Sequence, residues 1–249
     1  MALLNTENIT VSYDGKTIIR DVSIELCEGE LVSLLGRSGS GKTTLFNVIS
    51  GLLTPDCGHV YLDGADITGI CGSVSYMLQK DLLLPYKTII DNVSLPLVLR
   101  KMSRKKSRET ASRYLDEFGL TDTEKKYPNE LSGGMRQRAA LLRTYLFSNR
   151  VALLDEPFSA LDKITKDSMH DWYINIMKQI KLSTLFITHD IDEAILLSDR
   201  IYILGGEPAG ITDEILIEPS DVRSRHLMLS PNFLRYKKQI MDAIGVVTE

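Results

Sequence analysis

Short apolar stretches alternate with amphipathic ones along most of the chain. Patterns of β-strands occur at 11–13, 18–26, 31–35, 59–62, 73–78, 151–154 and 184–187. Three of these, 31–35, 151–154 and 184–187, are continuously apolar, which is typical of strands buried on both faces. The interval 43–52 has the pattern of a helix. Because strands and helices alternate, we expect a mostly parallel sheet with its functional site at the carboxyl edge.

The middle of the chain has a different pattern. From 87 to 146 helical periodicity dominates and strand signals are few. Strand patterns return after this interval and weaken beyond Gly205. The order is therefore a sheet-rich first part, a helical insert, a second sheet-forming part and a tail that is hard to assign from its pattern. We favour a packing role for the tail, with a regulatory or partner-contacting extension as the alternatives.

A glycine-rich loop follows the apolar strand at 31–35. Gly36–Thr43 fits G-x-x-x-x-G-K-[ST], between a strand and a helix as that motif requires. Its glycines let backbone N–H groups turn toward phosphates, where a Cβ would obstruct them. Lys42 is expected to reach the β- and γ-phosphates, and Thr43 to offer a hydroxyl to Mg²⁺.

A second phosphate-binding pattern lies far along the chain, at Ser132-Gly133-Gly134. A serine and two glycines that open a helical run provide a helix N-terminus suited to an anion. One nucleotide does not need two such sites from one subunit. We therefore expect a nucleotide clamped between two copies of the protein, with Ser132 distant from Lys42 of its own chain.

Acidic and imidazole groups follow the two later buried strands. Asp155 suits Mg²⁺, whose preferred ligands are oxygens, and Glu156 is placed to polarise an attacking water. His189, one strand–helix unit later, should reach the same sheet edge and bind a γ-phosphate oxygen or orient Glu156. Gln79, also at a strand end, could contact Mg²⁺ or water. Tyr13 precedes the glycine loop and could stack on adenine.

Composition narrows the classes of function. The net charge of −4 over 249 residues provides no global basic field for nucleic acid. The basic run at 100–108 fits a solvated helix face better than a lipid or nucleic-acid site. Cys27, Cys57 and Cys71 have no metal-binding spacing and indicate reduced thiols. No apolar run is long enough to span a bilayer, so a membrane role would need a partner.

Together these motifs resemble the ATP-binding cassette family, the nucleotide-binding subunits of ABC transporters. The resemblance covers nearly all of 1–205 and keeps the order of the family's motifs, including the signature at 131–135 and the D-loop at 159–162. Met135 stands where the family usually has glutamine. We expect this difference to alter the packing around Met135 and to leave the activity in place. The resemblance implies an α/β fold of the P-loop NTPase class, with a RecA-like core, an N-terminal antiparallel β-subdomain and an inserted helical subdomain. The implied division is 1–84, 85–145, 146–205 and a C-terminal extension at 206–249.

The resemblance also implies the site. Its nucleotide-binding residues would be Tyr13, Gly36, Arg37, Ser38, Gly39, Ser40, Gly41, Lys42, Thr43, Thr44, Gln79, Ser132, Gly133 and Gly134. Its catalytic residues would be Glu156, His189 and Lys42, and its Mg²⁺ ligands Thr43, Gln79 and Asp155. ATP and Mg²⁺ are the implied cofactors.

The implied assembly is a homodimer of cassettes beneath transmembrane permease subunits, at the cytoplasmic face of the membrane. The segment 77–88, with Leu84-Pro85-Tyr86, resembles the nitrate/sulfonate/taurine importer branch, which implies an extracytoplasmic solute-binding protein as well. The main alternative is a soluble ABC-type ATPase acting on nucleic acid or ribosomes. That class usually has coiled-coil insertions or two cassettes in one chain. A small GTPase or a kinase would explain Gly36–Thr43 but not Ser132–Gly134.

Overall fold

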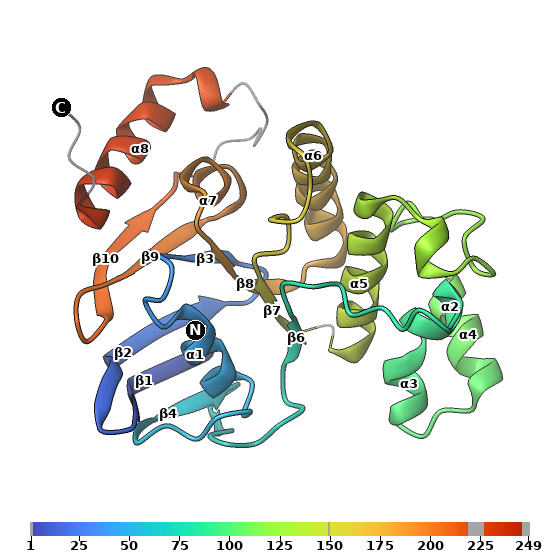
Figure 1. Ribbon diagram of the computed structural model, residues 1–249, viewed down its shortest axis with the longest axis horizontal. Coiled ribbons are helices and arrows are strands. Elements are labelled where there is room, and N and C mark those ends of the chain that lie inside the picture. Colours follow the sequence, from blue (N-terminus) through green and yellow to red (C-terminus); the bar gives the residue numbers. More distant parts are fainter. Residues whose placement is uncertain (1, 149, 219–226, 246–249) are drawn as a thin grey trace.

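A computed structural model describes residues 2–148, 150–218 and 227–245 (Figure 1). An antiparallel sheet has the order β2-β1-β4-β5, and a six-stranded sheet has the order β10-β9-β3-β8-β7-β6. The strands of the antiparallel sheet are β1 (Ala2–Tyr13), β2 (Lys16–Cys27), β4 (Cys57–Leu62) and β5 (Ala65–Asp66). Those of the larger sheet are β3 (Leu31–Leu35), β6 (Ser75–Met77), β7 (Val151–Asp155), β8 (Ser183–Thr188), β9 (Arg200–Gly205) and β10 (Gly210–Leu216).

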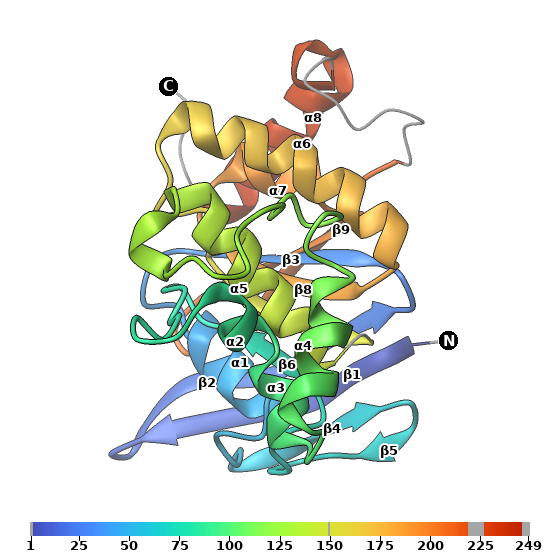
Figure 2. The ribbon, with the colours of Figure 1, turned by 90° about the vertical axis from the view of Figure 1, so that its right-hand side faces the viewer.

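Helices surround the larger sheet. They are α1 (Lys42–Ile49), α2 (Ile89–Val93), α3 (Leu95–Leu99), α4 (Arg104–Ser112), α5 (Gly133–Phe147), α6 (Lys163–Ile180), α7 (Ile191–Leu197) and α8 (Pro231–Ile244), with short 3₁₀ turns at Pro128–Glu130 and Leu227–Leu229. The helices α2 to α5 gather at one end of the molecule, away from the antiparallel sheet (Figures 1 and 2). In the part of the chain that is described, no helix combines the length and apolarity needed to cross a bilayer.

The register of the parallel strands sets the position of the site. Leu35 of β3 pairs with Thr188 of β8, and Asp155 of β7 pairs with Ile187 of β8. These strands are buried along their whole length, and β3 and β7 are apolar at all but one position each, whereas β8 also buries Ser183, Thr184 and Thr188. The loops that follow β3, β7 and β8 therefore leave the sheet at one edge, as the sequence predicted.

Two separate apolar cores lie on the two faces of this sheet. Alternate residues of each strand point to opposite faces, so that Leu153 belongs to the core with the antiparallel sheet and α1, whereas Leu154 belongs to the core with α5 and α6. Phe186 of β8 belongs with Leu154, and its neighbours Leu185 and Ile187 with Leu153. The two cores thus lie on opposite faces of the sheet and share its strands through alternate residues.

Element boundaries differ slightly from the sequence prediction. The helix expected at 43–52 ends at Ile49, and the strand expected at 73–78 is limited to Ser75–Met77. Gly51 explains the early end of α1, because its φ of 77° is incompatible with a continuing helix. The helical run predicted to end at 146 continues to Phe147.

The tail adds the edge strand β10 to the larger sheet, and its helix α8 packs beside that sheet. α8 buries Phe233, Tyr236 and Ile240 in a third core, which also contains Leu35 at the end of β3. This agrees with the expected packing role of the tail. The parts 219–226 and 246–249 of the predicted extension lie outside the described residues.

Candidate nucleotide site

The glycine loop begins directly after β3 and ends in α1, as the motif requires. Lys42 and Thr43 line a hollow of about 360 Å³ together with Tyr13, Ser38, Gly39, Gly41, Thr44, Asp155 and Glu156. A Cβ at Gly36 would lie 2.4 Å from the carbonyl oxygen of Leu204, so any larger residue would force the loop to shift. Gly41 has a φ of 92°, which lets the loop turn into the helix.

Tyr13 ends β1 at the rim of this hollow. The turn that follows it is Asp14-Gly15, with φ of 50° and 78°, as in the tight hairpin turn that this pair favours. Tyr13 is 47% exposed beside the hollow, and an aromatic ring at this place can stack on a flat partner. This is the position that the sequence predicted for adenine stacking.

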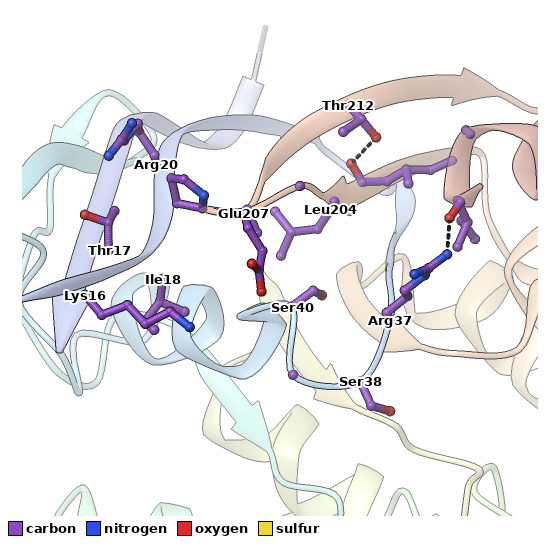
Figure 3. Close-up of a pocket in the computed structure, with 18 of the residues that line it drawn as sticks. Lys16, Thr17, Ile18, Arg20, Arg37, Ser38, Ser40, Leu204, Glu207 and Thr212 are labelled. Atoms are coloured by element: carbon purple, nitrogen blue, oxygen red, sulfur yellow. Dashed lines mark hydrogen bonds between the residues drawn. The ribbon is translucent and has the colours of Figure 1, made fainter. Parts of the chain in front are cut away.

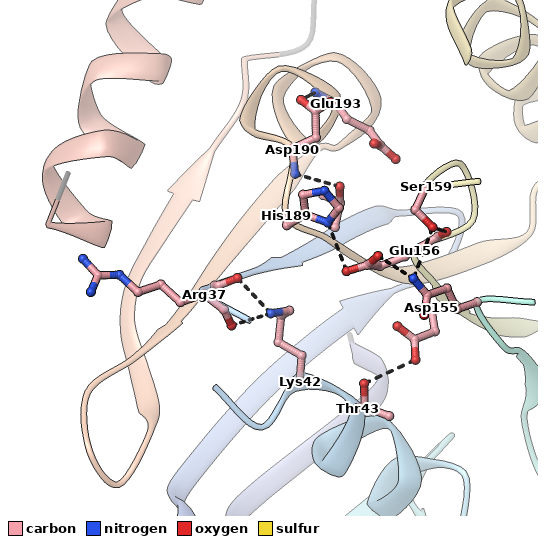
Figure 4. A network of polar contacts seen from close by, with 12 residues as sticks. Arg37, Lys42, Thr43, Asp155, Glu156, Ser159, His189, Asp190 and Glu193 are labelled. Atoms are coloured by element: carbon pink, nitrogen blue, oxygen red, sulfur yellow. Dashed lines mark hydrogen bonds and ion pairs between the residues drawn. The ribbon is translucent and has the colours of Figure 1, made fainter. Parts of the chain in front are cut away.

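Lys42 lies deep in the loop. Its Nζ donates to the carbonyl oxygens of Gly36 and Arg37, each at 2.8 Å (Figure 4). Burial lowers the pKa of Lys42, and the nearby carboxylates of Glu156 and Asp155 oppose that effect. The ammonium group therefore lies where anionic phosphate oxygens would gain strongly from it.

Arg37 is the member of the loop whose side chain leaves the hollow. Its guanidinium donates to the carbonyl oxygens of Ile244 and Gly245, at 3.0 and 3.4 Å, at the C-terminal end of α8. Figure 3 shows the Arg37 side chain with the first of these bonds. It lines a separate cavity of about 930 Å³, which shares Ser38 and Gly39 with the nucleotide hollow. In this structure the Arg37 side chain therefore points to α8 and not into the nucleotide hollow. The sequence offers no signal for this side-chain contact, since its partner is more than two hundred residues away.

Asp155 ends β7 beside Thr43. The Asp155 carboxylate accepts from the Thr43 hydroxyl at 3.3 Å and from the Tyr76 hydroxyl at 3.4 Å. Burial raises the pKa of Asp155, which means that its charge is poorly solvated. A hard cation would relieve this, and the neighbouring oxygen donors of Asp155 and Thr43 fit Mg²⁺, which takes few protein ligands when phosphates supply the others. Gln79, the third predicted ligand, lines the adjacent hollow and donates to Glu156. Sequence reasoning did not include Tyr76, although it lies on β6, which ends two residues before Gln79.

Glu156 is held from two sides. Its Oε1 lies 3.0 Å from His189 Nδ1, and its Oε2 accepts from Gln79 Nε2 at 3.0 Å (Figure 4). The backbone of Glu156 has a φ of 46°, in the left-handed region, and its N–H donates to Ile187. A non-glycine residue rarely adopts this conformation, which here turns the side chain out of the strand toward His189. The structure thus brings together the three residues that the sequence placed at strand ends.

Ser132 begins α5, as predicted. Its Oγ accepts from the N–H of Met135 at 3.3 Å, so this serine serves as the N-cap of the helix in its own chain. Gly133 lines a different hollow from Lys42, together with Gln79, Glu156, Ser159 and His189. Met135, at the position that departs from the family pattern, packs against the core of the helical insert.

Comparison with known proteins identifies the family. Residues 19–159 match the family model described as ABC transporter. The chain belongs to the ABC transporter family. It is an ABC-type ATPase subunit, as its motifs predicted.

The relatives agree on one branch. The chain is 43% identical to the formylaminopyrimidine import ATP-binding protein ThiZ of Halalkalibacterium halodurans, over 90% of this chain and 87% of that protein. It is 39% identical to the nitrate import ATP-binding protein NrtD of a Synechocystis strain, covering 98% and 94%. It is 37% identical to the taurine import ATP-binding protein TauB of Yersinia pestis, covering 97% of each. These names match the branch that the segment 77–88 predicted.

Solved structures share the fold. A dimeric post-hydrolysis state of the cassette MJ0796 bound to ADP and Pi has a TM-score of 0.73 and 28% identity, covering 87% of this chain and all of that one. The cbiO1 subunit of the Clostridium perfringens complex cbiONQ has a TM-score of 0.79 at 22% identity, covering 98% and 97%, which supports the fold alone.

Proposed function

We propose that this ATPase powers an importer. Two copies close around ATP and Mg²⁺ at the cytoplasmic face of the membrane and drive solute uptake through separate permease subunits. The observation that carries the proposal is the position of Glu156, held by His189 and Gln79 next to the Lys42, Thr43 and Asp155 cluster. This arrangement suits hydrolysis at a γ-phosphate.

Glu156 is the proposed general base. Its carboxylate takes a proton from a water molecule as the water oxygen attacks the γ-phosphorus, while the bond to the β-phosphate oxygen breaks and ADP leaves. Lys42 stabilises the charge on the phosphate oxygens. His189 orients Glu156 through the 3.0 Å contact of its Nδ1 and can also donate to the γ-phosphate. Gln79 holds the other oxygen of Glu156 and places the attacking water.

Thr43, Gln79 and Asp155 are the proposed Mg²⁺ site. When bound, Mg²⁺ would neutralise charge on the β- and γ-phosphate oxygens. Thr43, Asp155 and Gln79 would hold the ion through their side-chain oxygens, and the Thr43 hydroxyl already donates to the Asp155 carboxylate at 3.3 Å. The buried position of Asp155 and its raised pKa support this role.

Ser132, Gly133 and Gly134 are proposed to bind the γ-phosphate of the nucleotide held by the partner copy. Two observations support this. Lys42 and Gly133 line different hollows of one chain, and the related cassette MJ0796 forms a dimer with ADP and Pi. With identical subunits, both composite sites are competent.

The permease is proposed to contact the loop after Gln79 and the helical insert. Tyr86 is 73% exposed in that loop, and Leu82 and Leu99 are also exposed. The names of the relatives indicate small polar or ionic solutes such as nitrate, taurine or a thiamine precursor, delivered by an extracytoplasmic binding protein. The acidic net charge argues against nucleic acid as a partner.

The discriminating variant is Glu156→Gln. It keeps the shape of the side chain and its contact with His189 but cannot accept a proton, so it should bind Mg²⁺-ATP, hydrolyse it at least about a hundredfold more slowly and accumulate as a dimer. Steady-state phosphate release and size-exclusion chromatography with ATP measure these effects. The control is Glu109→Gln, which changes an exposed glutamate of α4 and should keep full turnover. Full turnover in Glu156→Gln would refute the base assignment. Stimulation of the wild-type ATPase by nucleic acid or ribosomes would favour the soluble alternative instead.

A further inference from the structure

We propose that Lys166 is a positioning residue for hydrolysis, which fixes the loop of His189 to the start of helix α6. The inference rests on the proposed function, because it concerns how Glu156 and His189 keep their mutual geometry. Lys166 does not line the nucleotide hollow and acts only through other residues.

Lys166 is a partly buried cation between two carboxylates. Its Nζ lies 2.7 Å from Asp190 Oδ2 and 2.9 Å from Glu193 Oε2. The side chain of Glu193 is 3% exposed and that of Lys166 18%, so this contact is shielded from solvent. Burial acts to lower the pKa of Lys166, but the two carboxylates outweigh it and the pKa is raised. The lysine is therefore held as a cation.

Asp190 connects this cation to His189. While Oδ2 contacts Lys166, Oδ1 accepts from the N–H groups of Asp192 and Glu193, at 3.0 and 3.2 Å, and so caps helix α7. The N–H of Asp190 donates to the Thr188 hydroxyl at 3.1 Å. His189 is thus held between two anchored neighbours (Figure 4).

The other side of Lys166 leads back to Glu156. The N–H of Lys166 donates to the carbonyl of Asp162 at 2.8 Å, and the Asp162 carboxylate caps α6 through Thr165. The turn before Asp162 starts at Glu156, whose carbonyl oxygen accepts from the Ser159 hydroxyl at 3.0 Å.

These links form a closed ring. It runs from Glu156 through the turn to α6, across Lys166 to Asp190, and through His189 back to the Glu156 carboxylate. Breaking the ring at Lys166 frees the His189 loop from α6 without touching a nucleotide contact. Turnover should therefore fall while the affinity for ATP is kept, because a small misplacement of a catalytic group can cost up to about a hundredfold in rate.

The test separates positioning from stability. Lys166→Met leaves the Glu193 carboxylate buried without its cation and should destabilise the fold. Adding Glu193→Gln removes that buried charge and should restore the urea midpoint, yet the tether to Asp190 remains broken. We expect the double variant to keep the ATP KM within about twofold and to lose about tenfold or more in kcat. Lys166→Arg, which can still contact both carboxylates, should retain at least about half of the wild-type kcat.

A matched control uses Lys237, which contacts Asp192 in the same first turn of α7 at 2.6 Å. Lys237→Met removes a lysine of α8 that contacts α7 without touching the ring, so its kcat should equal that of the wild type. Recovery of kcat together with stability in the double variant would show a purely structural role and overturn the inference. An equal loss of kcat in Lys237→Met would overturn it too. Neither result would affect the proposed function, which depends on wild-type hydrolysis and its loss in Glu156→Gln.

Discussion

The buried histidine of α6 predicts a specific dependence of stability on pH. His170 packs edge-on against the ring of Phe158, with 5.0 Å between the ring centroids, and its Nε2 has no hydrogen-bond partner within the described residues. Burial, with a smaller contribution from the charge of Lys166, lowers the pKa of His170 from 6.5 to about 4. The folded protein therefore keeps this imidazole neutral where the unfolded chain already binds a proton.

The sign and size of the effect follow from this difference. As the pH falls below 6.5, the unfolded state takes up more protons than the folded state, so stability is lost progressively until the pH reaches about 4. Between about pH 7 and pH 5, the two pKa values correspond to a loss of about 2 kcal/mol in the free energy of unfolding. That is a large fraction of the stability of an ordinary domain.

The measurement compares urea unfolding at these two pH values for the wild type and for His170→Leu, without nucleotide. The variant should lose about 2 kcal/mol less than the wild type between the two conditions, because it lacks the group that titrates. Tyr173→Phe is the control, since Tyr173 packs against the same Phe158 ring and does not titrate in this range. An equal acid sensitivity in His170→Leu and the wild type would refute the reasoning.

Two further predictions concern the phosphate-binding elements. In the Glu156→Gln background, Ser132→Asp should abolish the ATP-induced dimer seen by size-exclusion chromatography, because it keeps an N-cap but places a negative charge toward the phosphate. The control Ser103→Asp, at the N-cap of α4, should leave the dimer intact. A dimer in both variants would argue against a contact between Ser132 and the nucleotide of the partner copy. Gly36→Ala should weaken ATP binding at least about tenfold in equilibrium titration, because its Cβ would collide with the carbonyl of Leu204. The control Gly205→Ala should bind ATP normally, since its Cβ would meet its nearest atom at 3.4 Å. Equal affinities in the two variants would show that the loop can move away from Leu204.

Local patterns were sufficient to predict much of this molecule. The structure confirms the buried strands predicted at 31–35, 151–154 and 184–187 and the parallel pairing between them. The comparisons confirm the ABC fold and family. These predictions succeeded because long apolar runs and a glycine loop between strand and helix have few other interpretations. The predicted contact between Glu156 and His189 is also present. The roles of the site residues and the domain boundaries stay predictions.

Long-range side-chain contacts were beyond the sequence. Lys166 looks like any solvated helix lysine until the fold places Asp190 and Glu193 beside it. Arg37 looks like a loop residue facing the nucleotide, yet its guanidinium contacts the end of α8. Such contacts depend on how the fold places distant segments beside each other. Hydrophobic periodicity and amino-acid composition carry no information about that placement.

The two separate cores have a consequence for how such proteins diversify. Leu153 and Leu154 are neighbours in sequence but pack on opposite sides of the sheet, and the apolar residues of α2 and α5 lie only on the side of Leu154. A lineage that acquires a new membrane partner can therefore exchange side chains throughout the helical insert without repacking α1 beneath the glycine loop. The half with the glycine loop is free to stay constant while the half proposed to contact the permease changes.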